Sequence, residues 1–423
     1  MPFRSGAISC ALFRVNGDAP DAVTGDLLDA CAEHTVRPST LGEPPEREFG
    51  WVAGRHIFDT TFDPDTVVFA ERMLLAMRTD TNRVPAEVRQ AYRAMAEQVR
   101  LDGDANRRLS RRERQEAREE ADEQCRQELA EGRHRRSTMT PVLWDLRSRL
   151  LYAPCTSDAA VNGLRELFSS TFGGRLDPCS SGVLALEFAE RKRLVRSYEE
   201  LRPSPLTAPP PQVAAHDSDS ARDRAVESHR PVVPWTLRGP EPKDFLGNEF
   251  LIWLWYRCDA DEGLFNTSAG EIAVVIDRLL EMDCAWDATG KQSLRGDGPS
   301  RLPEAREALK LGKWPRKVGL VLAAGDEPWN LTLQGDRVIY SGVKLPKPDE
   351  PPTTPRELIE SRLDGFLELD RAVQSLYEHF LAIRLGDGWR TEVDRISEWV
   401  RHPGRGRGTG RRTGTEMLAG ASA

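Results

Sequence analysis

The chain has 423 residues, of which 39% are hydrophobic and 30% charged, and its formal net charge is -8. This composition is typical of a folded protein with two or three domains and a highly charged surface, and no window reaches the 18 or more apolar residues of a membrane span. The start lacks the regions of a signal peptide, so we expect a cytoplasmic protein. Seven scattered cysteines without a C-x-x-C pair argue against disulfides and structural zinc, and we expect free thiols.

The first 200 residues predict strands that alternate with amphipathic helices. Pro85 opens one helix at its favoured first position, and Ser110 with Glu113 forms the capping box of a very polar helix over 110–132. The other expected helices cover 21–34 and 157–173. Strands are expected at 7–15, 48–54, 140–146, 149–155 and 181–189, with one longer strand or a strand pair over 65–80.

Residues 201–241 are rich in Pro, Ala and Ser, which predicts a flexible linker or exposed insertion between an N-terminal α+β region (1–200) and a C-terminal α+β region (242–400). The segment 244–258 is apolar on nearly all sides, which indicates a buried helix. Thr354, Pro355 and Glu357 predict the start of a long helix over 355–385. Strands are expected at 271–284, 316–324, 329–335 and 337–346. Residues 401–423 predict a disordered Gly/Arg tail.

Cations gather at a helix-to-strand junction in residues 307–322, EALKLGKWPRKVGLVL, although the whole chain is acidic. Lys310 ends the predicted helix before Gly312, and Lys313, Arg316 and Lys317 follow at the strand entrance. Similar clusters are Arg133, Arg135 and Arg136; Arg191, Lys192, Arg193 and Arg196; and the arginines of the tail. Four clusters at element ends, with few aromatic residues among them, favour contact with the phosphates of duplex DNA. Because we expect these side chains to be exposed, replacing Lys313, Arg316 and Lys317 should leave the melting temperature nearly unchanged.

One pattern suggests a metal-dependent nuclease. Asp177 precedes the expected strand at 181–189, and Glu190 and Lys192 follow it, as in nucleases whose carboxylates bind magnesium and whose lysine activates water. The E-x-K pattern is common in charged chains, so a solvated strand end is the simpler interpretation. The seven histidines have no metal-ligand spacing, and we expect no cofactor, no metal and no catalytic residue.

In its order of segments the chain resembles the recombination-associated RdgC family. The similar stretches include Gly50–Trp51, the helix after Pro85, MTPVLWD with Trp144, and the helix and strands of 303–346. The resemblance implies an α+β fold with mixed or antiparallel sheets, a horseshoe-shaped protomer, and two protomers that close into a ring around double-stranded DNA. Arg295 and Arg301 are the residues nearest to a Lys-Gln pair that the family carries before its Gly-Lys helix.

We therefore expect a non-catalytic, nucleoid-associated homodimer that binds double-stranded DNA without reading its sequence and limits recombinase access to it. Two alternatives remain: the nuclease, which would nick plasmid with magnesium, and a protein-interaction scaffold, which would not bind DNA at low salt.

Overall fold

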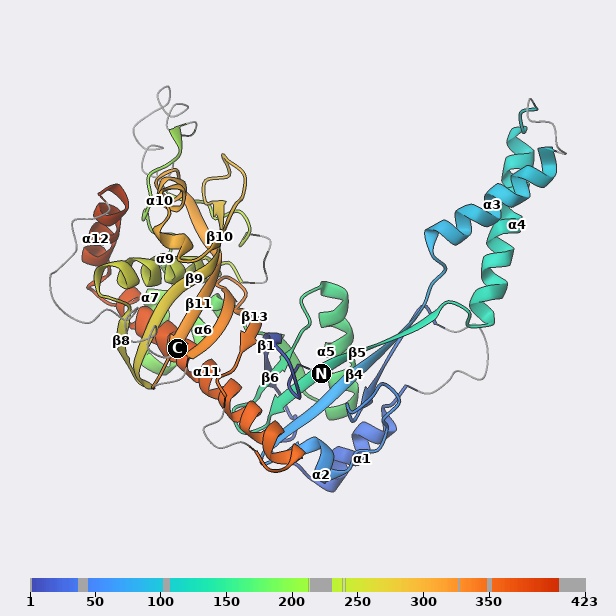
Figure 1. The fold of residues 1–423 in the computed structure, drawn as a ribbon, viewed down its shortest axis with the longest axis horizontal. Coiled ribbons are helices and arrows are strands. Elements are labelled where there is room, and N and C mark those ends of the chain that lie inside the picture. Colours follow the sequence, from blue (N-terminus) through green and yellow to red (C-terminus); the bar gives the residue numbers. More distant parts are fainter. Residues whose placement is uncertain are drawn as a thin grey trace. The chain divides into compact units, whose positions relative to one another are not determined.

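A computed structural model shows an α+β fold whose strands pair antiparallel, as predicted (Figure 1). The structure describes residues 2–36, 45–101, 107–211, 213, 230–237, 239, 241–325, 328–347 and 352–402. In this part of the chain, every helix is too short or too polar to cross a lipid bilayer. None of the seven cysteines forms a disulfide.

The chain divides into two compact units. Unit 1 comprises Met1–Arg14 and Asp177–Ala423, and unit 2 comprises Val15–Leu176. This division differs from the predicted regions 1–200 and 242–400. The reason is that helix α6 (Ser181–Lys192) packs on α9 (Phe245–Ala260) and α11 (Pro355–Arg384), so residues after 177 belong with the C-terminal part.

Unit 1 is built on an antiparallel sheet with the strand order β10-β9-β11-β12-β13-β1, and β8 also pairs with β9. The strands are β10 (Gln292–Gly296), β9 (Gly270–Cys284), β11 (Lys313–Ala323), β12 (Pro328–Gln334), β13 (Ile339–Lys344), β1 (Ile8–Asn16) and β8 (Leu264–Thr267). The remaining helices of unit 1 are α7 (Val195–Glu199), η2 (Pro299–Arg301), α10 (Pro303–Lys310) and α12 (Trp389–Arg401).

Helix α9 forms the centre of the unit 1 core. Every residue from Phe245 to Trp255 is buried, which confirms the predicted buried helix, and α9 packs against β9 and β11. Helix α9 approaches the loop after β12 so closely that a Cβ on Gly247 would lie 2.0 Å from the carbonyl oxygen of Gly335. A side chain at position 247 therefore cannot fit without moving the backbone.

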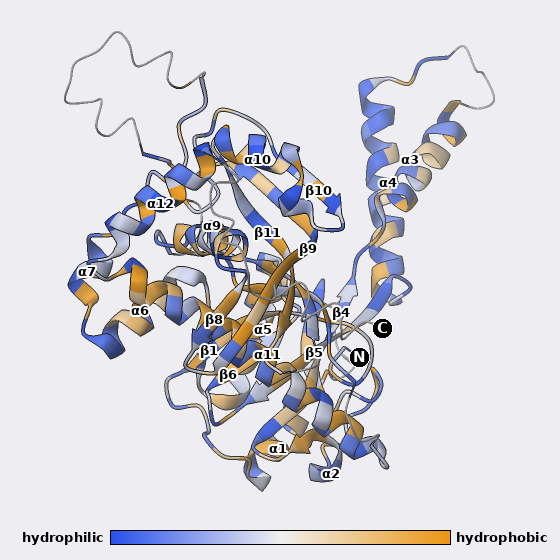
Figure 2. Cartoon of the chain, turned by 60° about the vertical axis from the view of Figure 1, so that its left-hand side comes forward, coloured by the Kyte–Doolittle hydropathy of each residue, from blue (hydrophilic) through white to orange (hydrophobic). Residues whose placement is uncertain are grey.

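Unit 2 contains an antiparallel sheet with the order β6-β5-β4-β2, and β3 also pairs with β4. Its strands are β2 (Arg47–Val52), β3 (Val68–Phe69), β4 (Arg72–Asn82), β5 (Arg135–Asp145) and β6 (Leu150–Ala153), and β7 (Arg175–Pro178) crosses into unit 1. Its helices are α1 (Gly25–Glu33), α2 (Pro64–Val67), α3 (Ala86–Leu101), α4 (Arg111–Ala130) and α5 (Asp158–Phe172). Helices α3 and α4 connect β4 to β5 and pack on each other beyond the ends of these strands (Figure 1), and α4 is mostly hydrophilic (Figure 2).

Several local predictions are confirmed by hydrogen bonds. The capping boxes of Ser110 with Glu113 and of Thr354 with Glu357 are both formed. The segment 65–80 contains the predicted strand pair, β3 and β4, but it begins with the helical turn α2, which we did not predict. Asp63 caps this turn by accepting from the amide of Asp65.

The prediction of a strand at 181–189 is wrong, because these residues form helix α6. The Ser180 side chain caps the helix by accepting from the amide of Val183, and the buried positions recur every three or four residues. These positions are Ser181, Gly182, Ala185, Phe188 and Ala189. A short apolar run fits a buried helix as well as a strand, and its Leu and Ala residues favour the helix.

Parts of the predicted linker are packed into unit 1. Leu206 and Val233 are fully buried, and the indole nitrogens of Trp314 and Trp389 donate to Thr207 and Ser204, each at 2.9 Å. The described residues of 201–211 and 230–239 therefore belong to the folded unit. The rest of the predicted linker, and the tail after His402, lie outside the described residues.

Candidate nucleic-acid interface

The junction between α10 and β11 has the predicted helix end. Helix α10 ends at Lys310, and Gly312 has a φ of 77°, a left-handed conformation that favours glycine. A Cβ on Gly312 would also lie 2.6 Å from the Trp286 ring, so the turn is closely packed. Lys313 is already the first residue of β11, paired with Cys284 of β9, rather than a loop residue before the strand.

Arg316 does not present a free charge to solvent. Its guanidinium lies 3.5 Å from a carboxylate oxygen of Asp283 and 3.4 Å from one of Asp336, and it stacks over the Trp235 ring at 5.0 Å. Asp336 is buried, so the arginine neutralises a carboxylate that water does not solvate. The expectation that Arg316 is an exposed surface cation is therefore wrong.

The lysines of the junction are more available. The ammonium of Lys317 lies 3.7 Å from Glu281, and its side chain is 43% exposed, so this pair is loose. Lys313 donates to the neutral side chain of Gln292 at 3.2 Å. Within the described residues neither Lys310 nor Lys313 has a carboxylate within 4 Å.

Strand β10 lies near the same junction. It pairs with β9, which pairs with β11, and the Lys313–Gln292 hydrogen bond joins the start of β10 to the start of β11. Arg295 on β10 and Lys291 just before it are exposed, with no ion pair to another described residue. Arg301 is exposed at the end of η2, the turn before α10.

A groove of about 460 Å³ runs over these strands on the surface of unit 1. Its lining mixes basic, acidic and amide side chains: Glu281, Met282, Asp283, Lys291, Gln292, Ser293, Arg316, Lys317 and Gln334. Because Lys317 and Arg316 each face an acid, Lys291 supplies the groove's only cation without an ion pair among the described residues.

The predicted cluster in unit 2 is also partly neutralised. Arg133 pairs with Glu131 at 2.7 Å, and Arg135 pairs with Glu48 at 2.9 Å and Asp80 at 2.8 Å. Arg135 and Arg136 lie inside β5 rather than before it. Arg136 is exposed and has no ion pair within the described part of the chain.

The residues of the nuclease hypothesis do not have the predicted arrangement. Asp177 lies on β7, whereas Glu190 and Lys192 lie in the last turn of helix α6, so the strand assumed between them does not exist. Among the described residues, no group of three His, Cys, Asp or Glu side chains could hold a metal ion.

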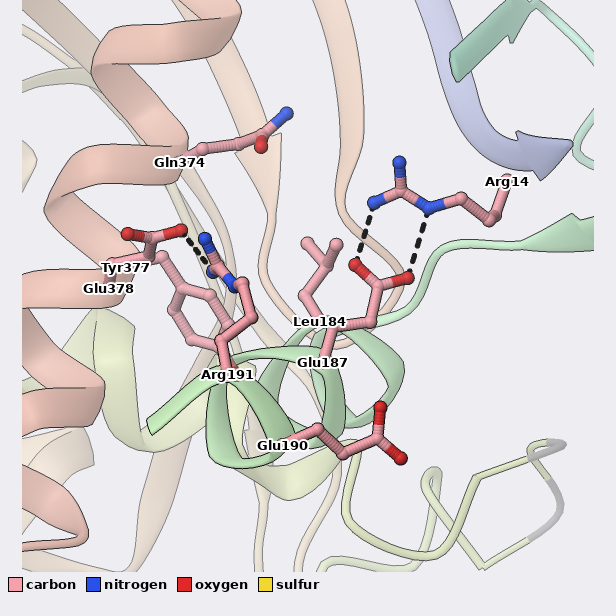
Figure 3. A pocket seen from close by; sticks show the side chains of 8 residues that line it. All are labelled: Arg14, Leu184, Glu187, Glu190, Arg191, Gln374, Tyr377 and Glu378. Carbon is pink, nitrogen blue, oxygen red and sulfur yellow. Dashed lines mark hydrogen bonds and ion pairs between the residues drawn. The ribbon is translucent and has the colours of Figure 1, made fainter. Parts of the chain in front are cut away.

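Glu190 lines a pocket of about 400 Å³ in unit 1 (Figure 3). Two other glutamates of this pocket are already paired, Glu187 with Arg14 and Glu378 with Arg191, each at 2.6 Å. Asp177 and Lys192 are not among its lining residues.

Two features escaped the sequence analysis. Lys291 was not predicted as a DNA contact, although a lysine just before an alternating strand is typical of an exposed strand entrance. The acids that neutralise Arg316 and Arg135 come from other strands, and nothing next to the arginines in the sequence indicates them. No protein-family model matches the chain, and no curated protein matches it either.

Proposed function

We propose that the protein binds double-stranded DNA through its phosphates, without reading sequence and without catalysis, and thereby limits the access of a recombinase to the bound DNA. The observation that carries the proposal is a group of cations near one edge of the unit 1 sheet that form no ion pair with another described residue: Lys291, Arg295, Lys310 and Lys313. They lie at the end of α10, at the start of β11, and on or just before β10, which β9 separates from β11.

The binding energy in this proposal comes mainly from release of counterions from the DNA. A lysine that has no carboxylate nearby can replace a condensed cation at a phosphate, whereas Arg316, held by two aspartates, would first have to lose its own partners. The net charge of -8 does not oppose this mechanism, because phosphate binding depends on where the cations lie.

A salt titration tests the proposal. We expect the logarithm of the affinity for a duplex to fall linearly with the logarithm of salt concentration, by about 10³-fold or more between about 50 and 200 mM for six or more phosphate contacts. A scrambled duplex should bind equally well. The variant Lys291→Ala/Lys310→Ala/Lys313→Ala should show a salt slope that is shallower by up to about 3 units.

The matched control removes the same charge elsewhere. Arg93, Arg112 and Arg126 each pair with a glutamate on their own helix, and their triple alanine variant should keep the parent slope. A flat salt response or a strong sequence preference in the parent would contradict the function. Equal slopes for the lysine variant and the parent would contradict the site. Magnesium-dependent nicking of plasmid would favour the nuclease instead.

The proposal includes a homodimer, and helix α3 supplies an observation that favours it. Met95 and Val99, one helical turn apart, are 60% and 77% exposed, so an apolar stripe of α3 faces solvent. We expect a dimer by sedimentation equilibrium at micromolar concentration, and Met95→Lys/Val99→Lys should weaken it because burying two ammonium groups is unfavourable. Gln90→Lys, at an exposed position elsewhere on α3, should leave the dimer intact. A monomeric parent would refute this part.

A further inference from the structure

The ribbon formed by β2, β4 and β5 in unit 2 has two faces of very different charge. Residues directly opposite each other on neighbouring strands point to the same side of a sheet. The pairing of Glu48 with Asp80 and of Asp80 with Ser137 places acidic residues on one face. The pairing of Arg47 with Thr81 and of Thr81 with Arg136 places two arginines on the other face.

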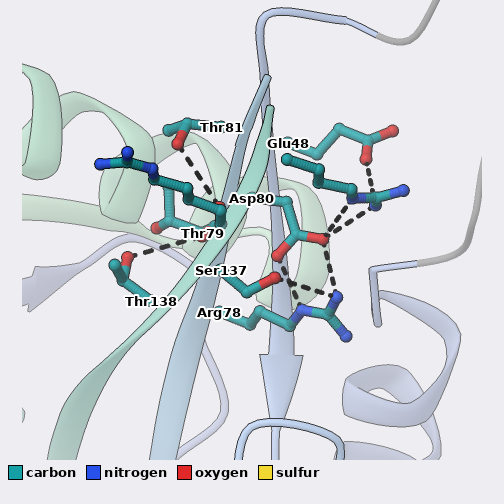
Figure 4. Close-up of polar contacts among 9 residues, drawn as sticks. Glu48, Arg78, Thr79, Asp80, Thr81, Ser137 and Thr138 are labelled. Atoms are coloured by element: carbon teal, nitrogen blue, oxygen red, sulfur yellow. Dashed lines mark hydrogen bonds and ion pairs between the residues drawn. The ribbon is translucent and has the colours of Figure 1, made fainter. Parts of the chain in front are cut away.

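The acidic face is neutralised internally. Arg78 donates to both carboxylate oxygens of Asp80, at 2.8 and 2.7 Å, and Arg135 bridges Asp80 to Glu48 (Figure 4). Burial acts to raise the pKa of Asp80, but the hydrogen bonds from Arg78, Ser137 and Arg135 more than offset it and hold the pKa below its usual value. Two arginines and two carboxylates thus leave this face without net charge.

The opposite face keeps its charge. Figure 4 shows Thr79, Thr81 and Thr138 on the side of the ribbon away from Asp80 and Glu48. The positions on this face are Arg47, Phe49, Trp51, Met77, Thr79, Thr81, Arg136, Thr138 and Thr140, and none is acidic. Arg47 and Arg136 are exposed, and neither has an ion pair with another described residue.

Helix α5 covers only one end of this face. Trp51 donates to Thr171 of α5 at 2.9 Å, and the Phe49 ring lies against Gly163 of the same helix. The other end, at Arg47, Thr81 and Arg136, faces solvent. Since strands lie about 4.8 Å apart, the two arginines flank Thr81 at a backbone separation of about 10 Å. Their side chains can therefore reach two phosphates of one DNA strand.

The hydroxyl groups on this face are weakly engaged. Thr81 donates to the carbonyl of Arg136 and Thr138 to that of Thr79, both at 3.4 Å, near the upper limit for a hydrogen bond. A phosphate oxygen is a stronger acceptor than a backbone carbonyl because it carries a charge. These hydroxyls can therefore turn toward an anion at little cost.

We propose that Arg47 and Arg136, with Thr81 and Thr138 between and beside them, form a second phosphodiester-binding surface, located in unit 2. This inference rests on the proposed DNA-binding function and adds to it a site that has no residue in common with the lysines of unit 1. It assigns Arg136 a role in DNA contact, and it assigns Arg135 and Arg78 to the internal network that supports the ribbon.

The test compares three variants of the full chain in the duplex salt titration. Arg47→Ala/Arg136→Ala should bind more weakly, with a salt slope shallower by up to about 2 units. Arg47→Lys/Arg136→Lys, which keeps both charges, should retain the parent slope. Arg112→Ala/Arg126→Ala removes two exposed arginines of α4 that pair with glutamates, and it should also retain the parent slope. Thermal melting checks that each variant is folded.

The outcomes separate this inference from the function on which it rests. If the parent binds DNA with a steep slope and Arg47→Ala/Arg136→Ala has the same affinity and slope, the unit 2 surface is wrong and the function stands. If the parent does not bind duplex, both are wrong. If the alanine double variant is unfolded, the single variants Arg47→Ala and Arg136→Ala are measured instead. A salt slope that is shallower by about 1 unit in each single variant supports the unit 2 surface, and unchanged slopes overturn it.

Discussion

Replacing Arg384 with methionine is expected to lower the free energy of unfolding by about 3 to 5 kcal/mol. The guanidinium Nε lies 2.6 Å from Glu249 Oε2, and Glu249 is completely buried on helix α9. Arg384 also donates to the carbonyl of Arg202 at 2.8 Å and stacks over the Trp389 ring. Methionine would keep much of the packing but leave a buried carboxylate without its counter-charge.

A second variant distinguishes the charge from the packing. Glu249 also accepts from the amide of Ser204 at 2.6 Å, and glutamine at position 249 can still accept that bond. Arg384→Met/Glu249→Gln should therefore recover most of the lost stability, because no unpaired charge remains. Denaturant unfolding followed by circular dichroism measures both variants. A loss under about 1 kcal/mol for Arg384→Met would show that water or another group solvates Glu249.

Replacing Arg316 with alanine is expected to lower the free energy of unfolding by on the order of 3 kcal/mol. The change removes the cation that neutralises two carboxylates, Asp283 and the buried Asp336, and it removes the guanidinium that covers the Trp235 ring. Lys313→Ala and Lys317→Ala are the matched controls in the same strand, and each should change stability by about 0.5 kcal/mol or less.

The same three variants separate structure from DNA contact. Lys313→Ala should reduce the salt slope of duplex binding by about 1 unit, whereas folded Arg316→Ala should leave the slope unchanged because its charge is already neutralised. Asp336→Asn added to Arg316→Ala should restore part of the stability, since it removes one of the unpaired carboxylates. An Arg316→Ala variant that melts like the parent but has a shallower slope would contradict this assignment and return Arg316 to the DNA surface.

Features that depend on neighbouring residues could be predicted from the sequence. The capping boxes at Ser110 and Thr354 need only a hydroxyl and a glutamate three residues apart. Gly312, which adopts the left-handed conformation, stands between a predicted helix and a predicted strand and so indicates where the helix ends. Helix α9 was recognisable because apolar residues lie on nearly all of its sides and leave no polar face for solvent. The α+β class followed from the same local periodicities.

The structure of residues 181–192 and the packing of the predicted linker were decided by tertiary contacts. A run such as SGVLALEFA satisfies either period, and its helix is selected by packing on α9 and α11. Composition indicated that the Pro-rich segment is flexible, but Thr207 and Ser204 are held by tryptophans distant in the sequence. A segment rich in Pro and Ser forms little helix or strand, but a segment without regular secondary structure can still pack tightly.

The availability of each cation was also decided only in three dimensions. Arg316 and Lys313 are three residues apart and look alike in the sequence, yet the fold places Asp283 and Asp336 beside the first and a neutral glutamine beside the second. Likewise, Arg135 and Arg136 are adjacent in β5, and the alternation of a strand sends one into an acidic network and the other to solvent. Sequence shows where positive charge is concentrated, but whether that charge is free depends on carboxylates that other strands bring beside it.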